Sequence, residues 1–266
     1  MQGKMGEVKR KTLYFTAPRQ VELREETLPA LGAEDVLVET VCSAISAGTE
    51  MLIYQGRFPR DLETDPIISN LRGGFKYPLA YGYACVGKVV EVGKQVEGTW
   101  LDRLVFAFQP HTSHFVSEPK ALFPIPPSLQ PESVCFLPNM ETAVNLVQDA
   151  APILGERVLV LGQGVIGLLT TSLLREFPLD TLVTTDCYKL RRKASLDLNV
   201  RHSLDPNAES FQSEIQELCR VSTEPHKINP SAYTQRKFDL TFELSGNPNA
   251  LNDAITRSEE HTSELQ

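Results

Sequence analysis

The stretch VLVLGQGVIGLL, residues 158–169, decides the fold of this chain. It predicts a buried strand that runs directly into Gly162, Gly164 and Gly167 and then into an apolar helix. In a phosphate-binding turn the first glycine permits the tight turn, the second lets the backbone approach a pyrophosphate, and the third allows close packing of helix on strand. The helix N-terminus, with Val165 and Ile166, would face the phosphates. The stretch therefore predicts a dinucleotide-binding turn, with a glycine-lined packing turn as the alternative.

Asp186 ends the next predicted strand at the distance, about 20 residues, that such a turn leads us to expect. A carboxylate there can accept hydrogen bonds from the adenosine ribose hydroxyls, and it would repel a 2′-phosphate, which favours NAD over NADP. Arg191 and Arg192 follow just over one helical turn later and could meet a 2′-phosphate, so NADP stays open. The alternative role for both arginines is an exposed helix face.

Strands and helices alternate from this turn onward, which is typical of a doubly wound parallel sheet. The predicted order is strand 157–161, helix 165–176, strand 181–185, helix 188–197, strand 201–204, helix 208–220, a polar insertion to Lys237, strand 238–243 and the start of a helix. The dinucleotide-binding form has six strands in the order 3-2-1-4-5-6. We therefore expect the fifth and sixth strands to be missing and the fourth to be an exposed edge.

The part of the chain before this sheet, residues 11–127, shows short β-branched runs bounded by Gly, Pro and Asp. Examples are residues 36–41, 88–92 and 103–108, and the pattern predicts a small β barrel. After Pro126 and Pro127 the apolar residues change to helical spacing. We therefore predict a barrel domain over residues 1–135 and a nucleotide-binding domain over residues 136–256.

The last ten residues, RSEEHTSELQ at 257–266, resemble the in-frame translation of a sequencing adapter. We treat them as an artefactual tail, exclude them from fold reasoning and expect the chain to be truncated near Thr256. The alternative is an ordinary polar tail. A truncated chain with an open strand edge is expected to be poorly soluble or inactive.

The composition favours a globular protein that binds small molecules. The chain has 266 residues, of which 41% are hydrophobic and 23% charged, with a formal net charge of -8. An acidic balance disfavours nucleic acid and anionic membranes as partners, since both attract basic patches. Five widely spaced cysteines without a C-x-x-C pair indicate reduced thiols, and the N-terminus has no export signal, so we expect a cytoplasmic location.

Four segments around the glycine turn resemble the medium-chain dehydrogenase/reductase superfamily. They are VLVETVCSAISAGTE at 36–50, YPLAYGYACVGKVVEVG at 77–93, LPNMETAVNLV at 137–147 and FDLTFELSGNPNAL at 238–251. The resemblance implies an α/β fold, a GroES-like β barrel followed by a Rossmann doubly wound parallel sheet. It also implies an active site between the two domains, a homodimer when the chain is full length, and an enzyme that uses NAD or NADP.

This chain departs from the family pattern at the positions of the zinc ligands. At the positions where the resemblance places the ligands of zinc-dependent members, this chain has Ser46 or Ala47, Tyr83-Ala84 and Pro138. None of these is an ordinary zinc ligand. The cysteines of the family's structural zinc lobe are absent between Gly98 and Pro127. Conceivable ligands remain, but their spacing fits no standard zinc site and their alternative role is core or surface packing: Cys42, Cys85, His111 and His114. We therefore expect no metal.

Without a metal, other groups must stabilise the charge that develops during hydride transfer. The candidates, from segments that line the cleft in relatives, are Ser46, Thr49, Glu50, Tyr54 and Tyr83. Each has a structural alternative: Tyr83 could pack under the barrel and Glu50 could cap a turn. The Ser-Ala-Gly-Thr-Glu run resembles the bacteriochlorophyllide a dehydrogenase type, which oxidises a secondary alcohol.

The resemblance also implies cofactor contacts outside the glycine turn. Thr142 belongs to the helix whose start lies beside the nicotinamide in relatives, with helix capping as an alternative for it and for Asn139. Ser245 and Gly246 end the fourth strand at the carboxyl edge, where cofactors sit.

The leading interpretation is an NAD(P)-dependent, zinc-independent oxidoreductase that acts on an alcohol or carbonyl or on an activated alkene. Two alternatives stay open. One is a zinc alcohol dehydrogenase with non-standard ligands, and the other is a non-catalytic nucleotide-binding protein.

Overall fold

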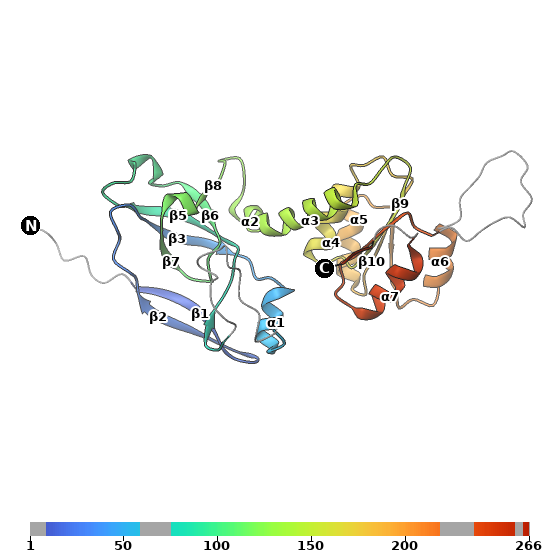
Figure 1. Cartoon of the computed structure of the whole chain (residues 1–266), viewed down its shortest axis with the longest axis horizontal. Helices are drawn as coiled ribbons and strands as arrows, with labels where there is room; N and C mark the ends of the chain where they lie inside the picture. Colours follow the sequence, from blue (N-terminus) through green and yellow to red (C-terminus); the bar gives the residue numbers. More distant parts are fainter. Residues whose placement is uncertain (1–8, 59–75, 219–236, 259–262, 266) are drawn as a thin grey trace, which may run out of the picture. The chain divides into compact units, whose positions relative to one another are not determined.

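The computed structural model of the chain divides into two compact units, Met1–Pro138 and Asn139–Gln266. It describes residues 9–58, 76–218 and 237–258, together with the backbone of 263–265 (Figure 1). The sequence-predicted insertion between residues 219 and 236 lies outside the described residues, as does part of the tail. Each unit is considered separately below.

Two antiparallel sheets form the first unit, as the β-branched runs predicted. One sheet has the order β2-β1-β4 and the other β7-β3-β5-β6-β8. The strands are β1 (Lys9–Ala17), β2 (Gln20–Thr27), β3 (Val36–Ser43), β4 (Leu79–Ala80), β5 (Cys85–Val92), β6 (Leu104–Ala107), β7 (His114–Ser117) and β8 (Phe123–Pro124), and the helices are α1 (Thr49–Gln55) and α2 (Pro131–Val134).

The core of the larger sheet lies on the face that Val36, Val38 and Val89 share. In register, Val38 of β3 stands opposite Val89 of β5, so apolar side chains meet across the strand pair. The segment before β7 ties this sheet to the smaller one. Leu13 N–H donates to the His111 carbonyl at 2.9 Å, and Thr40 N–H donates to the Ser113 carbonyl at 2.9 Å. This connection holds His111 between the two sheets.

The second unit is a parallel sheet with the strand order β11-β10-β9-β12-β13. Its strands are β9 (Arg157–Leu161), β10 (Thr181–Thr185), β11 (His202–Leu204), β12 (Leu240–Glu243) and β13 (Ser263–Leu265), and its helices are α3 (Leu137–Ala150), α4 (Val165–Leu174), α5 (Lys189–Asp197), α6 (Phe211–Leu218) and α7 (Pro248–Arg257). Counted along this unit the order is 3-2-1-4-5, which confirms the doubly wound prediction.

The central strand β9 is buried along its whole length and serves two cores. Val158 and Val160 pack against residues of α3 and α4, whereas Leu159 and Leu161 pack against residues of α6 and α7. Because successive side chains of a strand point to opposite faces, helices must cover both faces of this sheet. Figure 1 shows α3 and α4 on one side of the sheet and α6 and α7 on the other.

The far edge of the sheet differs from the expectation. The sequence interpretation left β12 as an open edge, but Ser263–Leu265 pairs with it as β13, with Phe242 opposite Glu264. That three-residue strand comes from the segment that the sequence analysis excluded as a tail. An unpaired strand edge recruits any chain of strand-forming length nearby, which accounts for the pairing. The expected open edge is therefore wrong.

Candidate functional site

The three glycines of the turn each have a different reason to lack a side chain. Gly162 has a φ of 95°, and a Cβ on it would lie 2.6 Å from the Ser245 backbone nitrogen. A Cβ on Gly167 would lie 2.0 Å from the Gly162 carbonyl oxygen, so only glycine lets α4 pack on the turn. Around Gly164, in contrast, a Cβ would meet nothing within 4 Å. The turn therefore closes at its two outer glycines and leaves space at the middle one.

The space at Gly164 lies at the N-terminus of α4. Gly164 is the N-cap of this helix, and no side chain of the described residues caps it. The first N–H groups of a helix have no partner within the helix, and the helix dipole favours negative charge at this end. An open glycine beside an uncapped helix start fits the pyrophosphate of a dinucleotide.

Asp186 lies against the turn, as the spacing predicted. Its Oδ2 accepts the Gln163 backbone N–H at 2.8 Å and its Oδ1 accepts the Tyr188 N–H at 2.7 Å. The carboxylate therefore links the ends of β9 and β10 through these backbone donors. The side chain is only 5% exposed. Each oxygen keeps a second lone pair, and the ribose contact stays a prediction.

The two arginines after Asp186 have different surroundings. Arg192 is bound into the fold: it donates to the Asp186 carbonyl at 2.7 Å and pairs with Asp205 at 2.9 Å. Arg191 is 45% exposed, lies 3.6 Å from Asp186 Oδ2 and stacks over the Tyr188 ring at 4.9 Å. Arg191 is thus the arginine that could reach a 2′-phosphate.

The remaining cofactor candidates lie at the end of β12 and in α3. Ser245 N–H donates to Glu243 Oε1 at 2.9 Å, and the Ser245 backbone lies against Gly162. Gly246 has a φ of 65°, which is the left-handed region that glycine enters at little cost. Thr142 is half-buried. Because α3 begins at Leu137, Thr142 lies inside the helix and does not cap its start.

In the first unit, three of the five catalytic candidates share one turn. Ser46 N–H donates to Glu50 Oε1 at 2.9 Å, and Thr49 N–H donates to Ser46 Oγ at 3.3 Å. Glu50 thus makes the turn-capping contact weighed from the sequence. Of the other two candidates, Tyr54 packs against the cluster of Phe15, Ile53 and Tyr81, and Tyr83 packs edge-on to Tyr81 with ring centroids 6.3 Å apart.

The sequence analysis missed the partner of Glu50. His111 Nε2 lies 2.8 Å from Glu50 Oε2, and both side chains are buried, at 9% and 2% residue exposure. The other ring nitrogen, Nδ1, lies 2.8 Å from Ser43 Oγ. Because 61 residues separate His111 from Glu50, no local pattern indicates the pair. The one available signal was a histidine in the short run between two strands.

The cysteines considered as metal ligands lie in apolar surroundings. Cys42 Sγ lies 3.4 Å from Cys135 Sγ, and Cys85 contacts the Thr40 hydroxyl at 3.4 Å. Burial raises the pKa of the Cys85 thiol to about 11 and that of Cys135 to about 12. Both thiols are thus protonated at neutral pH in this packing. Within the described part of the chain, no group of three or more His, Cys, Asp or Glu residues could hold a metal ion.

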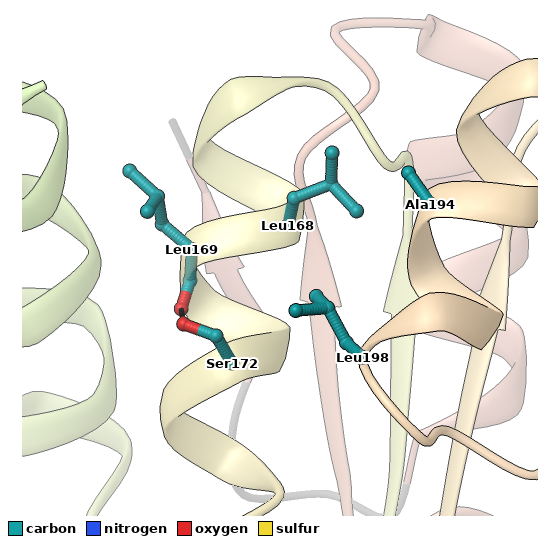
Figure 2. Close-up of a pocket in the computed structure, with 5 residues that line it drawn as sticks. All are labelled: Leu168, Leu169, Ser172, Ala194 and Leu198. Atoms are coloured by element: carbon teal, nitrogen blue, oxygen red, sulfur yellow. Dashed lines mark hydrogen bonds between the residues drawn. The ribbon is translucent and has the colours of Figure 1, made fainter. Parts of the chain in front are cut away.

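The second unit also has an open apolar groove between α4 and α5. Leu168, Leu169 and Ser172 line it from α4, and Ala194 and Leu198 line it from α5 and its end. Figure 2 shows Leu168 and Leu198 directed into the same space. The only hydroxyl, that of Ser172, donates to the Leu169 carbonyl at 2.7 Å. With so few polar groups, this groove does not suit the phosphates of a dinucleotide.

Across residues 9–58, 76–218 and 237–258, no helix is both long enough and apolar enough to cross a membrane.

The chain is similar to known proteins over most of its length, although no protein-family model matches it. L-threonine 3-dehydrogenase of Stenotrophomonas maltophilia (strain K279a) is 23% identical over 269 residues, which cover 90% of this chain and 71% of the relative.

Two solved structures share the fold. A short chain alcohol dehydrogenase from E. coli CFT073, complexed with NADH, has a TM-score of 0.71 at 17% identity, and the similarity covers 97% of this chain and 79% of that protein. The 2R,3R-butanediol dehydrogenase from Bacillus subtilis has a TM-score of 0.70 at 19% identity, covering 97% and 80%. The glycine turn and the strand order agree with this similarity, and the chain has the fold of these dehydrogenases.

Proposed function

We propose that the chain is a nicotinamide-dependent dehydrogenase that transfers a hydride between NAD(H) and an alcohol or carbonyl compound. The observation that carries this proposal is the glycine turn, where Gly164 leaves open space at an uncapped helix N-terminus. The relatives support it, because one is named for the oxidation of L-threonine, one for butanediol, and one contains NADH. The wider similarity thus agrees with the local geometry.

In this proposal the second unit binds the cofactor. The backbone N–H groups of Gly164, Val165 and Ile166 would bind the pyrophosphate, since they lie at the start of α4 beside the open space. Asp186 would accept the ribose hydroxyls. Further contacts would come from Ser245 and Gly246 at the end of β12 and from Thr142 of α3.

The cofactor preference follows from the charge at Asp186. Its carboxylate is held in place by two backbone N–H groups, so it cannot turn away from a 2′-phosphate. Arg191 lies only 3.6 Å away and offsets part of that negative charge. We propose NAD as the preferred cofactor, with NADP as a weaker substitute.

We also propose that the chemistry proceeds without zinc. The donor set supports this, because the buried Glu50 and His111 bind each other and Cys42 and Cys85 contact Cys135 and Thr40. No group of metal ligands is formed among the described residues. Polar groups of the chain would then have to stabilise the substrate oxygen. The hydroxyls of Ser46, Thr49 and Tyr83 are the proposed donors, and the Glu50 carboxylate would hold the turn that carries Ser46.

The bound nicotinamide would supply only the acceptor or donor of a hydride. The chain's own part is to orient the substrate, exclude water and handle the hydroxyl proton.

A turnover assay tests the proposal. NAD or NADP is mixed with L-threonine, (2R,3R)-butanediol and simple secondary alcohols, and reduced nicotinamide is followed by its absorbance. We expect NAD-linked oxidation that a chelator leaves unchanged, in protein without stoichiometric metal. Activity that requires added zinc would instead favour the zinc enzyme with non-standard ligands. Binding of NADH without turnover of any alcohol, carbonyl or activated alkene would favour a non-catalytic nucleotide-binding protein.

Three narrower statements stay predictions from the sequence: the homodimer, the cytoplasmic location and the similarity to the bacteriochlorophyllide a dehydrogenase type.

A further inference from the structure

Two thiols from distant parts of the sequence meet inside the first unit. Cys42 lies near the end of β3, and Cys135 follows directly after α2. Their Sγ atoms lie 3.4 Å apart, and Cys135 Sγ also lies 3.8 Å from the Cys42 carbonyl oxygen. Because 93 positions separate the two residues, only the folded chain brings these sulfurs together. Both residues belong to the same compact unit, Met1–Pro138.

Apolar packing holds the pair in place. Cys135 is 3% exposed and shares a buried cluster with Ala84, Val86 and Phe106, against which Cys42 packs. Val86 of β5 stands opposite Cys42 of β3 in register. The sulfurs of a disulfide lie about 2.0 Å apart, so each sulfur of this pair must move by only about 0.7 Å. Rotation about the two Cα–Cβ bonds can supply a movement of that size.

The other described cysteines have different surroundings. Cys85 belongs to the other core of the same sheet, in the cluster that contains Val36 and Val38, and it contacts the Thr40 hydroxyl at 3.4 Å. Cys187 is exposed and lies in the second unit. Among the described cysteines, Cys42 and Cys135 are therefore the pair whose sulfurs are in hydrogen-bond contact.

We propose that Cys42 and Cys135 form a reversible disulfide on exposure to a peroxide, and that this link stabilises the first unit. The proposal concerns one unit only and does not depend on the dehydrogenase function. The burial of the two thiols sets the order of reaction. Cys42 is partly exposed, whereas burial is the largest cause that raises the pKa of Cys135 to about 12. A peroxide therefore oxidises Cys42 first, because the reactive species is an accessible thiolate.

The reaction balances with hydrogen peroxide as the oxidant. The Cys42 sulfur attacks one peroxide oxygen, the O–O bond breaks, and Cys42 becomes a sulfenic acid while one water leaves with the thiol proton. The Cys135 sulfur then attacks the Cys42 sulfur. The S–S bond forms, the S–O bond breaks, and the hydroxyl leaves as a second water with the Cys135 proton. The two thiols lose two electrons in total, and the peroxide gains both. Contact between the two sulfurs offsets the small thiolate fraction of Cys135, because the second step is intramolecular.

The loop that this link closes contains most of the first unit. Between Cys42 and Cys135 lie α1, α2 and the strands from β4 to β8. Closing so long a loop restricts the unfolded chain more than the folded one, which stabilises the fold. Trp100, the one tryptophan of the chain, lies inside the loop, so its fluorescence reports the unfolding of this unit.

The first test maps the cysteines of the full, unsubstituted chain. The protein is treated with hydrogen peroxide, its remaining thiols are alkylated, and it is digested without reductant for mass spectrometry. We expect one linked pair of peptides that carries Cys42 and Cys135 and that dithiothreitol separates. Cys187, an exposed thiol, reports the peroxide dose. If Cys42 and Cys135 are still alkylated at a dose that fully oxidises Cys187, the proposal is overturned.

The second test separates the roles of the two thiols. Cys135→Ser removes the second thiol, and Cys85→Ser is its control, because Cys85 is also buried but lies in the other core. We expect peroxide to leave a sulfenic acid on Cys42 in Cys135→Ser, which dimedone labels, whereas Cys85→Ser still forms the linked pair. Equal dimedone labelling of Cys42 in both variants would overturn the proposal, since Cys135 would then take no part.

The third test measures stability in oxidised and reduced protein through the fluorescence of Trp100. We expect the Tm to rise by about 5 °C in the linked protein and to return to its starting value when dithiothreitol reduces the link. Peroxide should not raise the Tm of Cys135→Ser. An unchanged Tm in fully linked protein would overturn the stabilising role of the disulfide.

Discussion

At the residue scale, the site depends on which side chains hold the backbone donors around the glycine turn. Asp186 accepts two backbone N–H groups and lies near Arg191. A single carboxylate therefore links the turn and the next strand, and it also carries the charge that we propose favours NAD over NADP. Replacing it should separate these roles.

Asp186→Ser should narrow the preference for NADH over NADPH. Removing the negative charge ends its repulsion of a 2′-phosphate, and Arg191 is left to attract that group. We expect the ratio of the NADPH Kd to the NADH Kd to fall about tenfold, which corresponds to about 1.4 kcal/mol. Fluorescence titration with both cofactors measures it. Asp197→Ser is the control, because Asp197 forms an exposed pair with Lys193. An unchanged ratio would remove Asp186 from cofactor selection.

Gly167→Ala should destabilise the second unit strongly, whereas Gly164→Ala should not. The added methyl at Gly167 would lie 2.0 Å from the Gly162 carbonyl oxygen, and at Gly164 it would meet nothing within 4 Å. We expect the free energy of unfolding to fall by about 2–4 kcal/mol for Gly167→Ala and to change by less than about 0.5 kcal/mol for Gly164→Ala. Urea denaturation compares the two. Equal losses would mean that the turn is not packed as described.

At the scale of elements, local patterns predicted those segments whose burial is regular. Runs rich in β-branched residues predicted β9 and β10 at their observed bounds, because both strands lie inside the sheet, where such residues are favoured. The amphipathic α6 begins at Phe211 and not at residue 208 as predicted, since polar residues at a helix end leave the boundary unspecified, and the end predicted at residue 220 lies outside the described residues.

For the candidate site too, the local sequence predicted only some of the contacts. The glycine turn and Asp186 follow from local spacing, because a strand, a turn and a helix start are adjacent in sequence. The contact of His111 with Glu50 and Ser43 depends on two sheets being brought together by the segment before β7. No single-sequence pattern carries that information, so this contact could only be found in the structure.

The β1–β2 hairpin gives a prediction about pH. Glu26 on β2 accepts hydrogen bonds from Tyr14 at 2.6 Å, Thr12 at 2.9 Å and Arg10 at 3.1 Å. The Tyr14 hydrogen bond is the largest cause that lowers the pKa of Glu26 below its ordinary value of 4.5. A lowered carboxyl pKa contributes stability above that ordinary value, and the contribution is lost as pH falls through the folded pKa.

Glu26→Gln should therefore reduce the free energy of unfolding at neutral pH by about 1–2 kcal/mol, through weaker hydrogen bonds. It should also flatten the loss of stability in acid. Glu22→Gln is the control on the same strand, because Glu22 is exposed and pairs only with Arg24 among the partners described. Denaturant unfolding at neutral and acid pH measures both. An acid loss that persists unchanged in Glu26→Gln would assign it to other carboxylates.

At the scale of the whole molecule, two units with separate cores carry separate parts of the proposed chemistry. The second unit depends on its outer strand, because β13 covers the edge of β12. Uncovered parallel edges bind other chains.

Shortening the chain to end at Ser258 should therefore increase self-association. The shortened chain lacks Ser263–Leu265, so the backbone groups of β12 on that side lose the pairing that β13 provides. Light scattering against protein concentration, compared with the full chain, measures the effect. A shortened chain that stays as dispersed as the full one would show that β13 does not protect the edge.

The most direct test of the account is a fluorescence titration of NADH into the full chain, Gly164→Asp and Gly98→Asp. Both glycines have open space where a Cβ would lie, and neither has a positive φ, so the substitutions are matched for local strain. A carboxylate about 4 Å from a phosphate charge costs on the order of 4 kcal/mol at an effective dielectric constant of about 20. We predict NADH binding that Gly164→Asp weakens at least about 30-fold and Gly98→Asp leaves unchanged. Equal NADH affinity in all three proteins would contradict a cofactor site at this turn.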